Sequence, residues 1–217
     1  MKIKNNLPQF LLAAALTLGL AGAAVADDSR PAAAAPAPGS TGLLGETYAG
    51  LTYSYVNLHT SPVNADNVSF EYNEPLTAGF DSVFTYDWTQ AGLSLGDRAN
   101  QQTLSAALRA FGTGHAWGKP FIEAGLGYTW TRVAHVHDNS VYLEGTIGTE
   151  LQVAPAITVT PFVRYADAPD LAGNGNGTWS YGVKANWWVE RQWSITAGIS
   201  HGDNQETRYT IGTNFRF

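Results

Sequence analysis

Residues 80–88 read Phe-Asp-Ser-Val-Phe-Thr-Tyr-Asp-Trp. Aromatic rings recur at alternate positions of this stretch, and Asp81, Thr85 and Asp87 stand between them. A period of two residues is the period of a β-strand, because successive side chains point to opposite faces of a sheet. The stretch therefore predicts a strand with one aromatic face and one polar face.

The same alternation continues on both sides of this stretch, from Glu46 to the C-terminal Phe217. No segment with the period of a helix interrupts it. Counting the runs predicts ten strands at about 17 residues per strand with its connection. An eight-strand interpretation, in which the weakest pair of runs merges, stays open. Tight turns are expected at 75–78, 112–119, 154–156 and 190–192, and longer polar loops at 59–66, 93–100, 133–139, 167–177 and 202–205.

The aromatic residues gather near the ends of the runs, whereas Ala, Leu, Ile and Val fill the middle. A soluble β-sandwich would instead have aliphatic side chains at every depth of its core and polar strand ends. Two rims of aromatic rings around an aliphatic band are typical of a membrane-spanning barrel. We therefore predict an all-β fold, a closed antiparallel transmembrane β-barrel. One rim would hold Tyr55, Trp88, Trp130, Tyr165, Trp179 and Tyr209, and the other Phe80, Trp187, Trp193, Phe215 and Phe217.

The composition excludes several classes of function. Only 14% of the 217 residues are charged and the formal net charge is −6, which gives no basic groove for nucleic acid. The chain has no cysteine, so disulfides, cysteine-ligated metals and thiol nucleophiles are excluded.

The first 45 residues differ in composition from the rest. Lys2 and Lys4 precede the apolar stretch Phe10–Leu20, and Ala24-Val25-Ala26 fits the pattern that signal peptidase cleaves. Residues 1–26 are therefore a predicted signal peptide. Residues 27–45 are rich in Ala and Pro and have too few large apolar groups to repay their ordering entropy. We expect them to form a flexible periplasmic linker before the barrel domain, 46–217.

The polar face of the predicted strands becomes the lumen of the barrel. A barrel of eight to ten strands is only wide enough for its own side chains, so inward charges are expected to meet one another. The structural interpretation is a network of ion pairs that plugs the lumen, and the alternative is a narrow conducting path through it. The inward charges are Glu71, Asp81, Asp87, Arg109, Glu123, Glu144, Glu150, Arg164, Lys184, Arg208 and Arg216.

Histidines near acids are candidates for catalysis or metal binding. His201 lies near Asp203, and His135 and His137 lie near Asp138, but neither group belongs to a recognisable motif. Two imidazoles on one side of an extended segment do not by themselves form a metal site. We expect solvated loop residues here, with no catalytic, cofactor or metal site.

The chain resembles the small outer-membrane β-barrel proteins of Gram-negative bacteria, the opacity-protein or porin-like group. The resemblance covers Glu46 to Phe217 and rests on the cleavable signal, on residues 120–128 and 181–186, and on the last strand, residues 209–217, which ends on Phe217. It implies an outer-membrane location, contact with membrane lipid and lipopolysaccharide, and a terminal Phe217 that the barrel-assembly machinery reads as its signal. Many relatives have eight strands, and Pro161 inside a run predicts a bulge or a rim position.

Two functions are compatible with these features. The first is a structural or surface-interaction barrel with its lumen plugged by ion pairs, and the second is a narrow porin-like channel for small solutes or ions. The expected loops are longer than the turns but still short, which favours the structural or surface-interaction role. We expect a monomer that binds no nucleic acid.

Overall fold

The computed structural model describes residues 42–59, 64–92, 98–112, 118–133, 136–169, 171 and 177–217. The predicted signal peptide, most of the predicted linker and His135 lie outside these ranges. No helix among the described residues is long and apolar enough to cross a membrane.

The described part of the chain forms ten β-strands. This number confirms the ten-strand prediction, and the eight-strand alternative is wrong. The strands are β1 (Tyr48–Leu58), β2 (Asn64–Thr77), β3 (Phe80–Gly92), β4 (Arg98–Phe111), β5 (Lys119–Val133), β6 (Val136–Ala154), β7 (Ile157–Asp167), β8 (Thr178–Trp188), β9 (Trp193–Gly202) and β10 (Glu206–Arg216).

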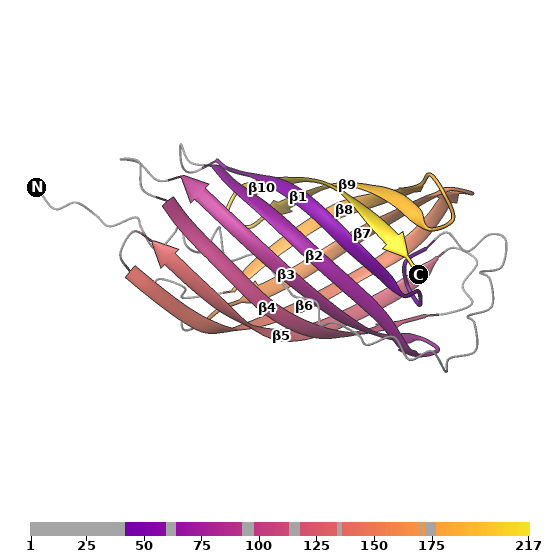
Figure 1. The fold of residues 1–217 in the computed structure, drawn as a ribbon, viewed down its shortest axis with the longest axis horizontal. Helices are drawn as coiled ribbons and strands as arrows, with labels where there is room; N and C mark the ends of the chain where they lie inside the picture. Colours follow the sequence, from indigo (N-terminus) through magenta and orange to yellow (C-terminus); the bar gives the residue numbers. More distant parts are fainter. Residues whose placement is uncertain are drawn as a thin grey trace, which may run out of the picture.

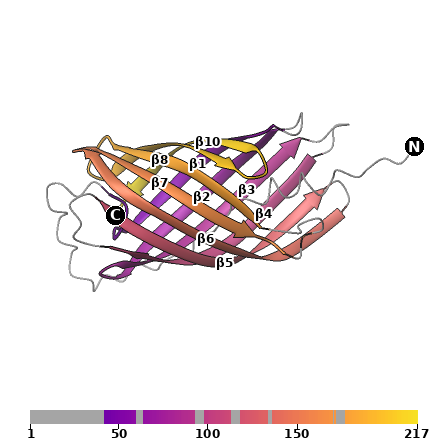
Figure 2. The ribbon, with the colours of Figure 1, turned by 180° about the vertical axis from the view of Figure 1, so that it is seen from behind.

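Each strand pairs antiparallel with the strands before and after it in the sequence, and β1 pairs with β10 to close the barrel (Figure 1). The β1–β10 ladder runs from Tyr48 opposite Arg216 to Leu58 opposite Glu206. The opposite side of the barrel shows the same unbroken wall (Figure 2). Closure pairs every strand edge, which is the condition for a sheet to stand in hydrocarbon. The predicted closed antiparallel barrel is confirmed.

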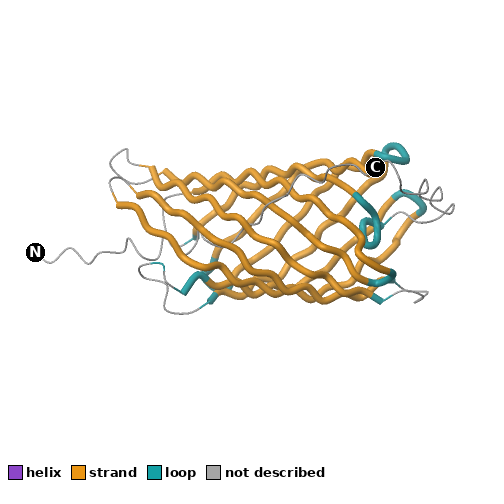
Figure 3. The backbone as a smooth tube through the Cα atoms, turned by 60° about the horizontal axis from the view of Figure 1, so that its bottom comes forward, coloured by secondary structure: helices purple, strands orange, loops and turns teal. Residues whose placement is uncertain are grey.

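The strands are tilted relative to the long axis of the barrel, and the C-terminus lies at one of its two ends (Figure 3). We call the end that carries Tyr48 and Phe217 the terminal end, and the opposite end the loop end. The connections at the loop end are shorter than the sequence suggests, because β2 already begins at Asn64 and β6 at Val136. Polar residues there continue the ladder, as where Asp66 pairs with Tyr55. Pairing needs only a neighbouring backbone, so it extends past the apolar part of a strand.

The wall is apolar outside and polar inside. Leu126, Ile147 and Leu108 are among the most exposed side chains, whereas Thr103, Thr129 and many other polar side chains are buried. A soluble domain has the opposite distribution. This inversion matches the two faces that the alternation predicts.

The aromatic rings of the predicted rims lie on the outside, close to the strand ends. Tyr165 packs against Trp179 with ring centroids 5.1 Å apart at the loop end. Trp193 packs against Phe215 at 4.8 Å at the terminal end. The exposed rings are Tyr55, Trp88, Trp130, Trp179 and Tyr209 at the loop end and Phe80, Trp187, Trp193 and Phe217 at the terminal end.

Pro161 forms neither the predicted bulge nor the predicted rim position, because it lies inside β7, Ile157–Asp167. It is opposite Val183 in a regular β7–β8 ladder, and the β6–β7 register is the same for Gly148–Phe162 as for Leu151–Val159. Pro161 has no N–H to donate, and its ring lies on the exposed face. The register shifts lie elsewhere, at 75–77 and 152–154, next to the turns.

Candidate lumen site

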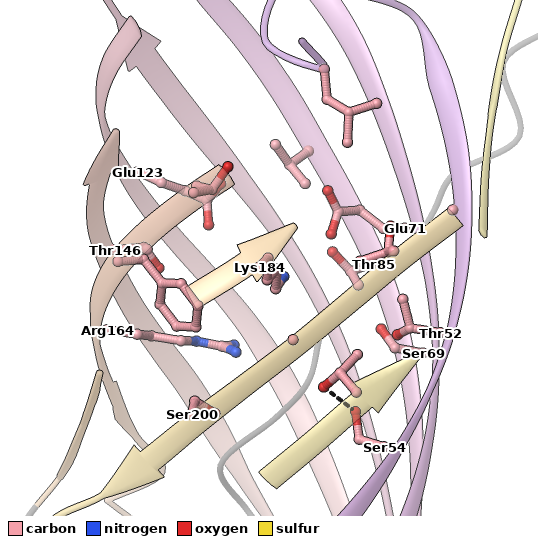
Figure 4. Close-up of a pocket in the computed structure, with 18 of the residues that line it drawn as sticks. Thr52, Ser54, Ser69, Glu71, Thr85, Glu123, Thr146, Arg164, Lys184 and Ser200 are labelled. Atoms are coloured by element: carbon pink, nitrogen blue, oxygen red, sulfur yellow. Dashed lines mark hydrogen bonds between the residues drawn. The ribbon is translucent and has the colours of Figure 1, made fainter. Parts of the chain in front are cut away.

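All ten strands contribute side chains to a cavity of about 210 Å³ inside the barrel. Figure 4 shows Glu71, Glu123, Arg164 and Lys184 pointing into this common space from different strands. Asp81 and Arg216 are buried at the terminal end instead. Of the eleven charges expected to point inward, the cavity lining includes Glu71, Asp87, Arg109, Glu123, Glu144, Glu150, Arg164, Lys184 and Arg208.

Arg109 is the centre of one charged cluster. Its Nε and Nη2 each lie 2.6 Å from Oε2 of Glu123 on the neighbouring strand β5. Its Nη2 also lies 3.7 Å from Glu71 on β2, and its Nη1 donates to Asn73 at 3.4 Å. The Tyr48 hydroxyl donates to Glu71. The positive charge of Arg109 is therefore shared between two carboxylates along the wall.

Arg164 is the centre of a second cluster, nearer the loop end. Its Nη2 lies 2.5 Å from Glu144 and donates to the Tyr142 hydroxyl at 2.9 Å. Ser105 donates to the other oxygen of Glu144 at 2.8 Å. Closer to the loops, Arg208 lies 3.7 Å from Glu206. The pairs therefore form layers at different heights of the lumen.

Two predicted acids are held by hydrogen bonds from uncharged donors. Asp87 accepts from the amide of Asn67 at 3.1 Å. Asp81 accepts from the backbone N–H of Gly45 at 3.0 Å. Sequence periodicity placed both acids in the interior without indicating these donors.

Lys184 differs from the other inward bases. Among the described residues it has no carboxylate within 4.0 Å, and its ammonium lies 5.7 Å from the centroid of the Phe162 ring. Its stem lies over Gly198 of β9, where an added Cβ would be 3.2 Å from its Cγ. Lys184 is exposed to the space inside the barrel. The expectation that it belongs to the ion-pair network is therefore wrong for the described residues.

Several interacting residues were not expected from the sequence. Glu206 pairs with Arg208, Lys119 lies 3.9 Å from Glu150, and Glu46 lies 3.9 Å from Arg216. Lys119 and Glu206 have the parity of the inward residues on their strands, so the alternation could have identified them. Glu46 precedes the first strand, where no periodic signal exists.

The opening of the barrel at its terminal end, the terminal mouth, contains residues just before β1 that the composition assigns partly to the linker. Residues 42–45 were expected to be flexible, yet Leu44 is only 4% exposed and Leu43 lines the cavity. Arg216 donates a hydrogen bond to the Gly42 carbonyl of this segment. Its guanidinium also lies 4.0 Å from the Trp188 ring centroid. The expected boundary at Glu46 therefore lies a few residues too late.

The loop end of the lumen contains apolar side chains that the alternation did not predict. Val56 and Leu58 of β1 form a buried cluster with residues of β2 to β5. A second cluster joins Tyr142 of β6 to Leu171 in the β7–β8 connection. The first cluster consists of Val56, Leu58, Ala65, Ala91, Ala99 and Val133.

The histidine groups do not assemble into a site in the described residues. His201 is 3.1 Å from the Thr207 hydroxyl, whereas Asp203 accepts from the Trp179 backbone N–H. Over the described ranges, no group of three or more His, Cys, Asp or Glu side chains is placed to hold a metal ion.

No protein-family model matches the chain, and a search of curated proteins gives no match. Similar solved structures include the β domain of the Bordetella autotransporter BrkA, with a TM-score of 0.49, 9% identity, and coverage of 80% of this chain and 100% of that one. The translocator domain of the autotransporter NalP from Neisseria meningitidis has a TM-score of 0.47, 10% identity, and coverage of 79% and 88%. The outer membrane protein OprG from Pseudomonas aeruginosa has a TM-score of 0.41, 12% identity, and coverage of 80% and 96%. The assignment of the fold rests on the strand pairing of this chain itself.

Proposed function

We propose that the protein is an outer-membrane β-barrel with a structural or surface-interaction role and a lumen held closed from within. The observation that supports this role is the pairing of inward charges along the wall: Arg109 with Glu123 and Glu71, and Arg164 with Glu144. Such pairs satisfy charges that would otherwise be costly in a narrow lumen, and they link neighbouring strands.

The outer surface supports the membrane location. An exposed band of aliphatic side chains lies between two rims of aromatic rings, and this is the surface that meets hydrocarbon and the two interfaces in transmembrane barrels. We propose that the barrel is a monomer whose partners are membrane lipid, lipopolysaccharide and, through Phe217, the assembly machinery. We assign it no catalytic role.

A conductance measurement tests the closed lumen. Purified protein inserted into a planar lipid bilayer is expected to give no stable current steps in KCl. Heat-denatured protein at the same detergent concentration is the control for leakage. Regular, long-lived steps from the native protein alone would contradict the structural role.

The alternative is a narrow channel for small solutes or ions, and the cavity with Lys184 favours it. A lysine without a carboxylate partner inside a lumen attracts anions. If the native protein conducts, a KCl gradient is therefore expected to give a reversal potential of anion selectivity. Replacing Lys184→Glu is then expected to shift that potential toward cations, with Arg98→Glu in β4 as a control at the barrel end.

A further inference from the structure

The segment Gly42–Thr47 lies in the terminal mouth of the barrel, before β1 begins at Tyr48. It makes a turn in which the Glu46 N–H donates to the Leu43 carbonyl at 3.2 Å. Gly45 has a φ of +83°, a left-handed conformation that favours glycine. Leu43 and Leu44 line the lumen cavity from this side. We call residues 42–47 the mouth segment.

Side chains from five strands around the ring bind the backbone of the mouth segment. Its N–H groups donate to two carboxylates, from Leu43 to Glu150 of β6 at 2.7 Å and from Gly45 to Asp81 of β3 at 3.0 Å. Its carbonyls accept from three donors: Lys119 of β5 bonds Leu44 at 2.8 Å, Asn73 of β2 bonds Glu46 at 2.8 Å, and Arg216 of β10 bonds Gly42 at 2.7 Å. Because these strands lie around the circumference, the mouth segment crosses the opening.

The barrel wall does not depend on these contacts. The β1–β10 and β1–β2 ladders that close the ring begin at Tyr48, beyond the mouth segment. Apart from the Phe217 N–H, which donates to the Thr47 carbonyl at 3.1 Å next to the β1–β10 ladder, the segment is held by side-chain hydrogen bonds and one buried leucine, Leu44. Residues 42–46 therefore have few buried apolar groups and no strand pairing, which are the properties of a part that opens locally while the rest stays folded.

We propose that the mouth segment is a displaceable plug that controls access to the lumen from the terminal end. The carboxylates of Glu150 and Asp81 and the cations of Lys119 and Arg216 form its seat. In the seated state the leucines face the cavity, and in the displaced state this charged ring becomes the lining of an open mouth. The proposal holds for either of the two functions above, because it concerns access rather than conduction.

The absence of cysteine from the chain allows a direct test. Thr85→Cys places a single thiol in the cavity lining, two inward positions above Asp81 on β3. The rate of its reaction with a charged, water-soluble maleimide is measured on folded protein in detergent. Heat-modifiable mobility in electrophoresis verifies that each variant retains the barrel.

Two changes displace the plug in the Thr85→Cys background. Deletion of residues 42–46 removes all of it except Thr47. Gly45→Val keeps it but strains it, because a β-branched residue rarely adopts this φ and the new Cβ would lie 3.1 Å from Phe111. Gly92→Val is the matched control, since a Cβ there meets no atom of the described residues within 4 Å.

We expect the deletion to raise the labelling rate about ten- to hundredfold, as for a seated state that opens only 1–10% of the time. Gly45→Val is expected to lie between the deletion and the parent, and Gly92→Val to match the parent. Equal rates in the parent and the deletion would overturn the proposal. If the deletion does not fold, Gly45→Val and Lys119→Met test the proposal instead. The thiol of both variants is expected to react faster than that of Gly92→Val. Labelling rates equal to that of Gly92→Val would overturn the proposal.

This result is separate from the test of function. A native protein that conducts would contradict the structural role, yet faster labelling after deletion would still support the plug. If the native protein does not conduct and the thiol of the undeleted Thr85→Cys protein reacts as fast as that of the deletion, the structural role stands and the plug proposal is overturned.

Discussion

Arg164 and Lys184 are inward bases on the neighbouring strands β7 and β8, but their surroundings differ. Arg164 lies 2.5 Å from Glu144 and also donates to Tyr142. Lys184 contacts the Phe162 ring and has no carboxylate within 4.0 Å among the described residues. The first base neutralises a buried acid, and the second is free to meet whatever occupies the cavity.

This difference predicts unequal costs for the same substitution. Arg164→Met leaves Glu144 buried without its partner, which typically costs about 3–5 kcal/mol. Lys184→Met strands no carboxylate of the described residues and removes one cation–π contact, worth about 0.5–1 kcal/mol at an exposed site. Thermal unfolding in detergent, followed by electrophoretic mobility, is expected to show a large decrease in midpoint for Arg164→Met alone. Similar midpoints for the two variants would show that the Arg164–Glu144 pair does not stabilise the barrel.

The sequence could place these side chains but not pair them. Alternation gives the face of each residue, and on that basis Arg164 and Lys184 are equivalent. The partner depends on the register between strands, since Thr146 rather than Glu144 is directly opposite Arg164. Periodicity within one strand carries no information about register with the next.

The closing pair of strands is the element on which the fold depends. Ser54 of β1 and Thr210 of β10 face each other in register, and their hydroxyl oxygens are 2.8 Å apart inside the lumen. Side chains this close are within the reach of a disulfide. Closure can therefore be trapped covalently.

The variant Ser54→Cys with Thr210→Cys is expected to oxidise readily once the barrel has formed. The bond would join residues 156 positions apart, so the unfolded, non-reduced chain should migrate faster in electrophoresis than the reduced one. Ser54→Cys with Ser200→Cys is the control, because Ser200 lies on β9 opposite Arg208 and not on a neighbour of β1. Equal cross-linking in both variants would contradict the β1–β10 register.

At the level of elements, periodicity predicted all the strands and misjudged their ends. Asn64 and Asp66 look like loop residues, yet they continue β2 against β1. Pro161 looks like an interruption, yet it occupies a regular position of β7 opposite Val183. In both cases the backbone of the paired strand decides the outcome, and the alternation within one strand does not show that pairing.

The exposed apolar band is a property of the whole molecule and distinguishes a membrane protein from a soluble one. Leu126 lies in the middle of β5 and is 66% exposed, whereas Leu76 lies at the end of β2 and is 55% exposed. In water, two such leucines would tolerate an arginine equally. In a bilayer, arginine costs about 2–4 kcal/mol at the midplane and about 0–1 kcal/mol near an interface.

We therefore expect Leu126→Arg to lower the free energy of unfolding from lipid bilayers by about 2–4 kcal/mol and Leu76→Arg by about 1 kcal/mol or less. Denaturant titration of protein folded into liposomes, followed by tryptophan fluorescence, measures both. Equal effects of the two variants would mean that the band does not face hydrocarbon.

The mouth segment marks the limit of what composition reveals about the whole molecule. Residues 42–45 belong by composition to an Ala, Pro and Gly-rich stretch, but their backbone groups meet Glu150, Asp81, Lys119 and Arg216. Those partners lie on four strands and come together only after closure. A low content of apolar residues predicts disorder only where the folded protein has no polar side chains placed to bind the backbone of the segment.

The ring also imposes an order in time. β1 is the first strand to leave the ribosome, and its second partner, β10, is the last: Ser54 and Thr210 are 156 residues apart. At synthesis rates of about 5–20 residues per second, the wait is about 8–30 seconds. Throughout that interval the segment that becomes β1 lacks its second partner, and its backbone groups can pair with any extended segment that they meet. A cell that makes this protein must therefore keep the growing chain apart from its own copies until its last eleven-residue strand has arrived.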